Sequence, residues 1–108
     1  MATGILGKAS LADSVNTTLY TVPAGKVTVC TINVCNTGTK TPLLRLALSA
    51  TTTPAANEWI EWDRSISSSA TWSPIERSGI VIGAGTSIVA YSAGVGVNIM
   101  VWGYEEAA

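Results

Sequence analysis

The sequence contains no histidine and no phenylalanine, and charged residues make up only 12% of it. Without histidine, the commonest general base, the usual catalytic triads and the commonest zinc ligand are all absent. Charged residues form about a quarter of a typical soluble domain, so this chain has an unusually neutral surface. A neutral surface is easily covered by a partner, which favours a protein that works by assembly.

Positive charge is also scarce, because six lysines and arginines are scattered over 108 residues and the formal net charge is −1. Binding to a phosphate backbone or to an anionic membrane surface requires concentrated positive charge. The sequence therefore predicts neither a nucleic-acid nor a membrane partner. The uncharged stretch Gly79 to Gly103 is long enough for a membrane helix. Its glycines and serines fall at turn positions between alternating β-branched residues, which favours strands instead.

The only two cysteines are Cys30 and Cys35. On one strand their α-carbons would lie about 16 Å apart, whereas a disulfide needs them within about 7 Å. We therefore expect two free thiols, which fits a protein made in a reducing cytoplasm. The start, Met1 to Asp13, lacks the charged region and long apolar run of a signal peptide, which gives the same expectation.

Short runs of β-branched residues separated by turn signals dominate the rest of the chain. In the stretch Thr18 to Asn36, two runs rich in Thr, Val and Ile surround Pro23-Ala24-Gly25. Pro23 suits the second position of a type I turn, and Gly25 suits its fourth position. The pattern predicts a short strand, a tight turn and a long strand.

Eight strand candidates are present, at residues 4–9, 15–22, 26–36, 43–49, 58–63, 75–82, 87–91 and 95–104. This pattern predicts an all-β, single-domain antiparallel β-sandwich of about eight strands, similar to a jelly roll. Residues 13–108 would form the sandwich domain, and residues 1–12 would be an N-terminal arm or an edge strand. We expect Ile5 and Leu6 to pack against a neighbouring chain, because an extended apolar segment gains hydrogen bonds by adding to a sheet edge.

Residues suited to catalysis are few. Glu61 and Asp63 would share a strand face about 7 Å apart, a spacing that suits a glycosidase pair or a calcium site. We favour a solvated face, paired with Arg64 or Arg77, and predict no enzymatic activity, no metal and no cofactor. A small hydrolase using the two carboxylates is the alternative.

The four tryptophans are the most informative side chains. Trp62 shares a predicted strand face with Ile60 and is expected in the core. Burial in a small core and a sugar-stacking platform are alternatives for the other three. We favour a subunit interface, where Trp and Tyr are enriched. The candidate interface residues are Ile5, Leu6, Trp59, Trp72, Trp102 and Tyr104.

Several blocks of the sequence, taken in order, resemble small structural proteins of tailed bacteriophages, cyanophages among them. The blocks are Leu19–Lys26 (LYTVPAGK), Ile32–Asn36 (INVCN), Arg45–Ser49 (RLALS), Glu58–Asp63 (EWIEWD) and Val101–Glu105 (VWGYE). The opening GILG is similar as well, so the resemblance covers nearly the whole chain. The loop Ser65 to Pro74 departs from the family pattern, in which a shorter turn leads into the equivalent of Ile75–Gly79.

This resemblance implies a non-enzymatic virion protein, namely a head decoration (cement) protein that stabilises the phage capsid. The implied partners are the major capsid protein or another virion protein, together with further copies of the chain in a homo-oligomer. The implied location is the virion, after synthesis in the host cytoplasm. The alternative is a tail or fibre component that acts as a receptor- or glycan-binding module.

Overall fold

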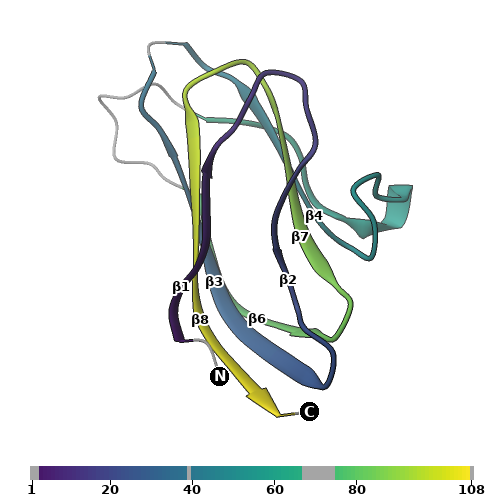
Figure 1. Cartoon of the computed structure of the whole chain (residues 1–108). Coiled ribbons are helices and arrows are strands. Elements are labelled where there is room, and N and C mark those ends of the chain that lie inside the picture. Colours follow the sequence, from purple (N-terminus) through teal and green to yellow (C-terminus); the bar gives the residue numbers. More distant parts are fainter. Residues whose placement is uncertain (1–2, 39, 67–74, 108) are drawn as a thin grey trace.

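The computed structural model describes residues 3–38, 40–66 and 75–107. In this part of the chain, eight strands form two antiparallel four-stranded sheets that pack as a sandwich (Figure 1), which confirms the predicted fold class. The elements are β1 (Thr3–Ser10), β2 (Thr17–Thr21), β3 (Lys26–Asn36), β4 (Leu43–Ser49), a 3₁₀ turn η1 (Ala56–Glu58), β5 (Trp59–Ser65), β6 (Ile75–Gly83), β7 (Ser87–Ala93) and β8 (Val97–Ala107).

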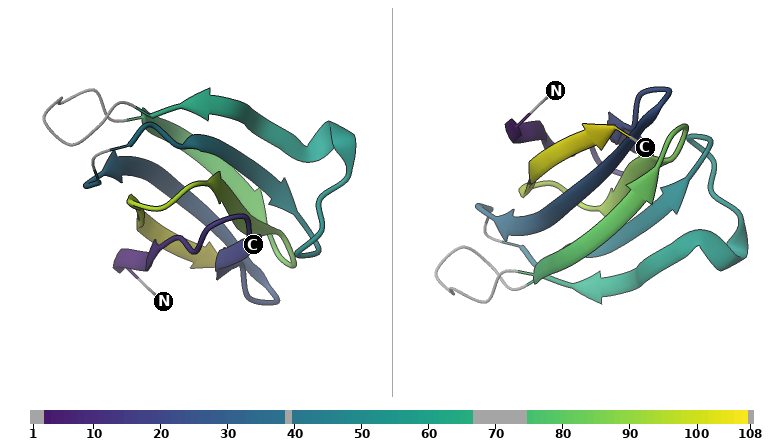
Figure 2. Two further views of the ribbon diagram at one scale, coloured as in Figure 1. Left: turned by 90° about the horizontal axis from the view of Figure 1, so that it is seen from above. Right: turned by 90° about the horizontal axis from the view of Figure 1, so that it is seen from below.

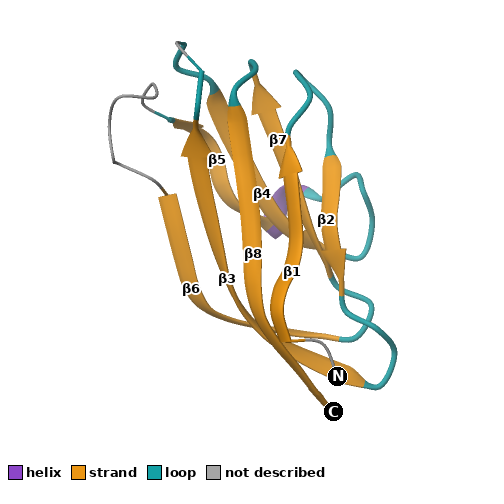
Figure 3. Ribbon diagram, turned by 60° about the vertical axis from the view of Figure 1, so that its left-hand side comes forward, coloured by secondary structure: helices purple, strands orange, loops and turns teal. Residues whose placement is uncertain are grey.

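The strand orders of the two sheets are β1-β8-β3-β6 and β2-β7-β4-β5. Strands β4 and β5 pair with each other, β3 pairs with β6, β2 with β7, and β1 with β8. The four pairs are nested like one long hairpin that is folded over into two sheets, which is the topology of a jelly roll. Figure 2 shows the two layers from both ends, and Figure 3 shows β6, β3, β8 and β1 side by side.

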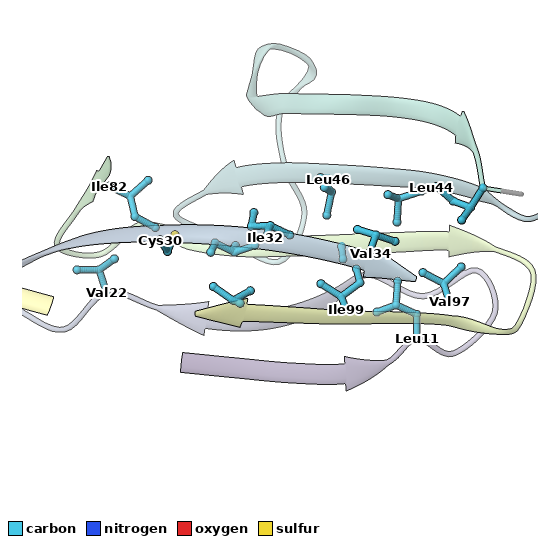
Figure 4. Packing of buried hydrophobic residues seen from close by; sticks show 14 residues of the cluster. Leu11, Val22, Cys30, Ile32, Val34, Leu44, Leu46, Ile82, Val97 and Ile99 are labelled. Carbon is cyan, nitrogen blue, oxygen red and sulfur yellow. The ribbon is translucent and has the colours of Figure 1, made fainter. Parts of the chain in front are cut away.

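The core lies between the sheets and is built from the side chains that point inward as residues alternate along each strand (Figure 4). On β3, every second residue from Thr28 to Asn36 is buried. The buried core side chains are all aliphatic, apart from Cys30: Leu11, Val22, Ile32, Val34, Leu44, Leu46, Ile66, Ile82, Ile88, Ala90, Val97, Ile99 and Val101. Because these aliphatic residues fill the core, the described tryptophans lie at least partly exposed.

The two thiols lie on opposite faces of β3, and both are free, as predicted. Cys30 points into the core and Cys35 is exposed. Burial raises the pKa of the Cys30 thiol, which keeps it protonated and unreactive.

The turn between β2 and β3 differs from the predicted one. The Lys26 N–H donates to the Pro23 carbonyl at 3.2 Å, so Pro23 is the first residue of the turn and Gly25 is the third. Gly25 has a φ of 75°, and a type II turn requires a positive φ at its third position. The predicted type I register is therefore wrong by one residue.

Strand β1 is an edge strand of the chain's own sheet, where it pairs with β8. A bulge between Ile5 and Gly7 shifts the alternation. Leu6 packs against the core of its own chain, whereas Ile5 is 58% exposed on the outer face.

At Gly103, β8 leaves no room for a side chain beside β3. The φ of Gly103 is 153°, and a Cβ there would lie 2.0 Å from the Val29 carbonyl oxygen. That oxygen belongs to the backbone of the neighbouring strand, so it cannot move aside as a flexible side chain would. Only glycine fits this position.

Gly103→Ala is expected to lower the free energy of unfolding by at least about 2 kcal/mol, because the added methyl group pushes two central strands apart. Gly83→Ala is the matched control, since a Cβ at Gly83 meets no atom within 4 Å. The control should change stability by less than about 0.5 kcal/mol. Urea unfolding of both variants is the measurement, and equal effects would contradict this description of the β3–β8 contact.

A buried polar group joins the two sheets near the end of β8. Glu105 is only 6% exposed and accepts a hydrogen bond from the Tyr20 hydroxyl of β2. The same hydroxyl lies 2.9 Å from the Thr28 hydroxyl of β3. The last strand predicted from the sequence ends at residue 104, whereas β8 continues to Ala107 and so includes Glu105. Burial, followed by the hydrogen bond to Glu105, raises the pKa of Tyr20.

Tyr20→Phe is expected to cost about 1 to 3 kcal/mol, because a buried carboxylate loses a hydrogen-bond donor. The folded state favours the neutral phenol, so this stabilisation is complete below pH 10.0 and is lost as the pH rises above that value. Thermal unfolding at about pH 8 and about pH 11 checks this. The difference between wild type and variant should shrink at the higher pH, and an unchanged difference would contradict the assignment.

Candidate functional site: two outer sheet faces

Exposed apolar side chains cross the outer face of the β1-β8-β3-β6 sheet. Cross-strand register joins them, with Ile5 opposite Trp102 and with Val29 between Tyr104 and Val81. We call this surface the apolar face and define it by six residues, Ile5, Val29, Val81, Met100, Trp102 and Tyr104. They come from all four strands of the sheet, which form one continuous layer in Figure 3.

Four of these side chains are substantially exposed: Val81 by 64%, Ile5 by 58%, Tyr104 by 41% and Met100 by 38%. Met100 faces outward because β8 alternates strictly over Val97–Val101, and Val81 faces outward because Ile80 and Ile82 on either side of it pack into the core. Charged residues stand at the margins of the apolar face, where Lys8 pairs with Met100 and Glu106 pairs with Val27. An apolar centre with a polar margin is the anatomy of a protein–protein interface.

A hollow of about 440 Å³ lies beside Met100 at the polar margin. Its polar walls bond to one another, since the Ser10 hydroxyl donates to Asn98 and the Asn98 amide donates to the Thr37 hydroxyl at 2.8 Å. This hollow shapes the margin of the apolar face, and its Ser10 and Asn98 side chains are held in structural hydrogen bonds.

The outer face of the other sheet carries a different arrangement, centred on Arg45 of β4. The Arg45 guanidinium carbon lies 3.7 Å from the Trp62 ring centroid and 4.7 Å from that of Tyr91. Asp63 holds the guanidinium through two contacts, Nε to Oδ1 at 2.6 Å and Nη2 to Oδ2 at 3.3 Å. Trp59 meets Trp62 edge to face, with centroids 5.2 Å apart. We call these five residues the arginine–tryptophan cluster.

Irregular pairing between β4 and β5 builds this cluster. The register shifts between Leu44 and Leu46 and again between Leu46 and Ala47, so β5 contains two bulges. Bulges change the face to which the following side chains point. Trp59 and Trp62 therefore meet on the outer face, and Trp62 is 56% exposed. The predicted core position of Trp62 is wrong, because it assumed regular alternation.

The bulges also separate the two carboxylates that the sequence placed on one solvated face. Glu61 pairs with the inward-facing Leu46 and is only 9% exposed. Its Oε1 lies 3.9 Å from Arg64 Nη1. Asp63, at a φ of 49°, instead binds Arg45. The prediction of a shared solvated face is wrong, and this geometry gives no support to a paired carboxylate mechanism.

The described residues contain no group of three or more His, Cys, Asp or Glu side chains that could hold a metal ion. No helix in the described part of the chain is long and apolar enough to cross a membrane. The hydrogen bond from Arg45 lowers the pKa of Asp63, so the ion pair persists into moderately acidic solution.

Release of the ion pair by acid is expected to change the tryptophan emission, because Arg45 is stacked on Trp62. Asp63 keeps its charge above pH 3.8 and is protonated as the pH falls below that value. The wild type should show an emission step with a midpoint below pH 3.8, and Asp63→Asn should lack it. Circular dichroism at each pH confirms that the fold persists. An identical step in the variant would contradict the assignment.

The predicted interface residues divide between several places. Ile5, Trp102 and Tyr104 lie on the apolar face, Trp59 lies in the arginine–tryptophan cluster, and Leu6 packs against the core. Trp72 lies outside the described residues. Five residues of these surfaces were not singled out from the sequence: Val29, Val81, Met100, Arg45 and Tyr91. The cross-strand register that brings them together is set by pairing between distant strands, so no local pattern signals it.

Comparison of the chain with protein-family models, with curated proteins and with solved structures gave no match.

Proposed function

We propose that this protein is a non-enzymatic structural protein of a tailed-phage particle, a decoration (cement) protein that attaches to the capsid through its apolar face. The observation that carries the proposal is the exposed apolar row across four strands, with Val81 64% and Ile5 58% exposed. The resemblance of the sequence blocks to phage structural proteins supplies the class of partner. The jelly roll occurs in viral capsid and lectin domains alike, so the fold by itself adds little.

The apolar face has the properties of a strong attachment surface. Trp102 and Tyr104 project from the same strand, and residues of these types contribute a large share of binding energy at protein interfaces. Strand pairing on both sides fixes the backbone of β8, so little conformational entropy is lost on binding.

A cement protein of this kind acts by mass action. A ligand that binds the assembled shell but not its separated subunits stabilises the shell, by an amount that rises with concentration and affinity. Many copies on one particle add their contributions, and contacts between copies in a homo-oligomer would strengthen attachment through avidity. No catalytic group is required, and the alternative location on a tail or fibre would use the same face.

Val81→Lys is expected to weaken attachment to phage heads by at least about tenfold, because it places a charge in the apolar face. Val95→Lys is the matched control, since Val95 is 61% exposed, close to the 64% of Val81, and lies in the turn before β8. The measurement is co-sedimentation with separated heads and tails of the phage that encodes the chain. Equal binding of both variants to heads would contradict the proposal, and binding to tails alone would favour the alternative.

A further inference from the structure

A second hollow, of about 600 Å³, lies on the β2-β7-β4-β5 side of the sandwich. Its walls are Pro54 and Ala56, from the segment before β5, together with Trp59 and Trp62. Because the tryptophans lie on the outer face of this sheet, the hollow is on the opposite side from the apolar face. It stays open when the apolar face is covered.

The Trp62 wall is held in a fixed position. Arg45 stacks on the indole at 3.7 Å, and Asp63 in turn fixes the guanidinium through two contacts. Trp59 supports the same ring edge to face. Because the Trp62 side chain is ordered before binding, little conformational entropy is lost when a ligand packs against it.

The local backbone is irregular in the way that binding sites often are. β5 contains two bulges, and Asp63 has a φ of 49°, which is uncommon for a residue other than glycine. A regular strand would place Trp59 and Trp62 on opposite faces of the sheet. The bulges therefore bring the two tryptophans together on the outer face. This exposure does not improve the packing of the core, which favours a functional reason for the irregular backbone.

The chemistry of the hollow fits an amphipathic, uncharged ligand. The side chains that line it are aromatic, proline and alanine side chains. The exposed residues Thr53 and Asn57 adjoin Pro54 and Ala56 in the sequence. The Glu58 carboxylate, whose Oε1 accepts from the Ser49 hydroxyl and from the Ala55 N–H, lies two residues after Ala56 and disfavours an anionic ligand. The volume falls within the range of about 300 to 1,000 Å³ that is typical of small-ligand sites.

We propose that this hollow binds a neutral saccharide, with a sugar ring stacked against the Trp59–Trp62 pair. The C–H groups on one side of a sugar ring suit the electron-rich face of an indole. Thr53 and Asn57, which are exposed and adjoin Pro54 and Ala56 in the sequence, are the candidate partners for the ring hydroxyls. The hollow is open and is lined by four residues, which suits a saccharide ring laid against the indoles better than an extended peptide, since a peptide requires a long groove. This site is additional to head attachment and does not depend on it.

The test uses a glycan array that includes neutral and acidic bacterial surface glycans, probed with the full chain. The strongest neutral ligand is then titrated by tryptophan fluorescence. Trp62→Ala is expected to weaken binding at least about tenfold, and Trp62→Tyr should restore part of it because the ring returns. Arg45→Lys keeps the charge but loses the planar stack on Trp62, so it should weaken binding about threefold or more. The melting temperature of this variant should stay close to that of the wild type.

Ala56→Gln fills the hollow without deleting a contact, and it should weaken binding at least about tenfold while the protein stays folded. Val95→Gln, which introduces the same residue into a turn outside the hollow, is the control and should bind as the wild type does. The proposal is overturned if no neutral glycan binds, if only acidic glycans bind, or if Ala56→Gln binds normally. Self-association that is lost with Ala56→Gln would also overturn it, by assigning the hollow to a second copy of the chain.

Discussion

The pleat of the β-strand, which sends successive side chains to opposite faces, is the constraint on which this structure depends. On β3, β4 and β8 it sends Ile, Leu and Val into one shared core. Because the core is filled by aliphatic side chains, the described tryptophans are pushed toward the outside. The outer faces of the sandwich therefore gather the described tryptophans together with Tyr91 and Tyr104, whereas Tyr20 packs against the core.

The regular part of this arrangement is readable from the sequence. The predicted strands 26–36 and 43–49 coincide with β3 and β4, since alternation and turn residues are local signals. β8 alternates without a bulge from Asn98 to Tyr104, so local alternation alone is enough to place Trp102 and Tyr104 on one face.

The irregular part of the structure was not predictable in this way. Two bulges in β5 move Trp62 out of the core and separate Glu61 from Asp63, and a bulge in β1 turns Leu6 inward. A bulge depends on how two distant strands pair, so a single strand's pattern does not contain it. The apolar face was missed as a unit for the same reason, since Val81 and Ile5 are brought together only by the register of four strands.

The two faces have different chemistry, and the account assigns them different tasks. The apolar face is broad, comes from four strands and suits a large protein surface. The arginine–tryptophan cluster borders a compact hollow on the opposite side and suits a small ligand. A protein that attaches through one sheet leaves the other sheet turned toward solvent, which makes the two tasks compatible.

Electron cryo-microscopy of the tailed-phage particle to which we propose that this chain belongs tests the central claim most directly. The account predicts copies of the sandwich distributed over the head, with the β1-β8-β3-β6 sheet against the shell and Trp62 facing solvent. Density for the sandwich at the tail alone would contradict the assignment to the head. Attachment to the shell through the β2-β7-β4-β5 sheet would contradict the role of the apolar face.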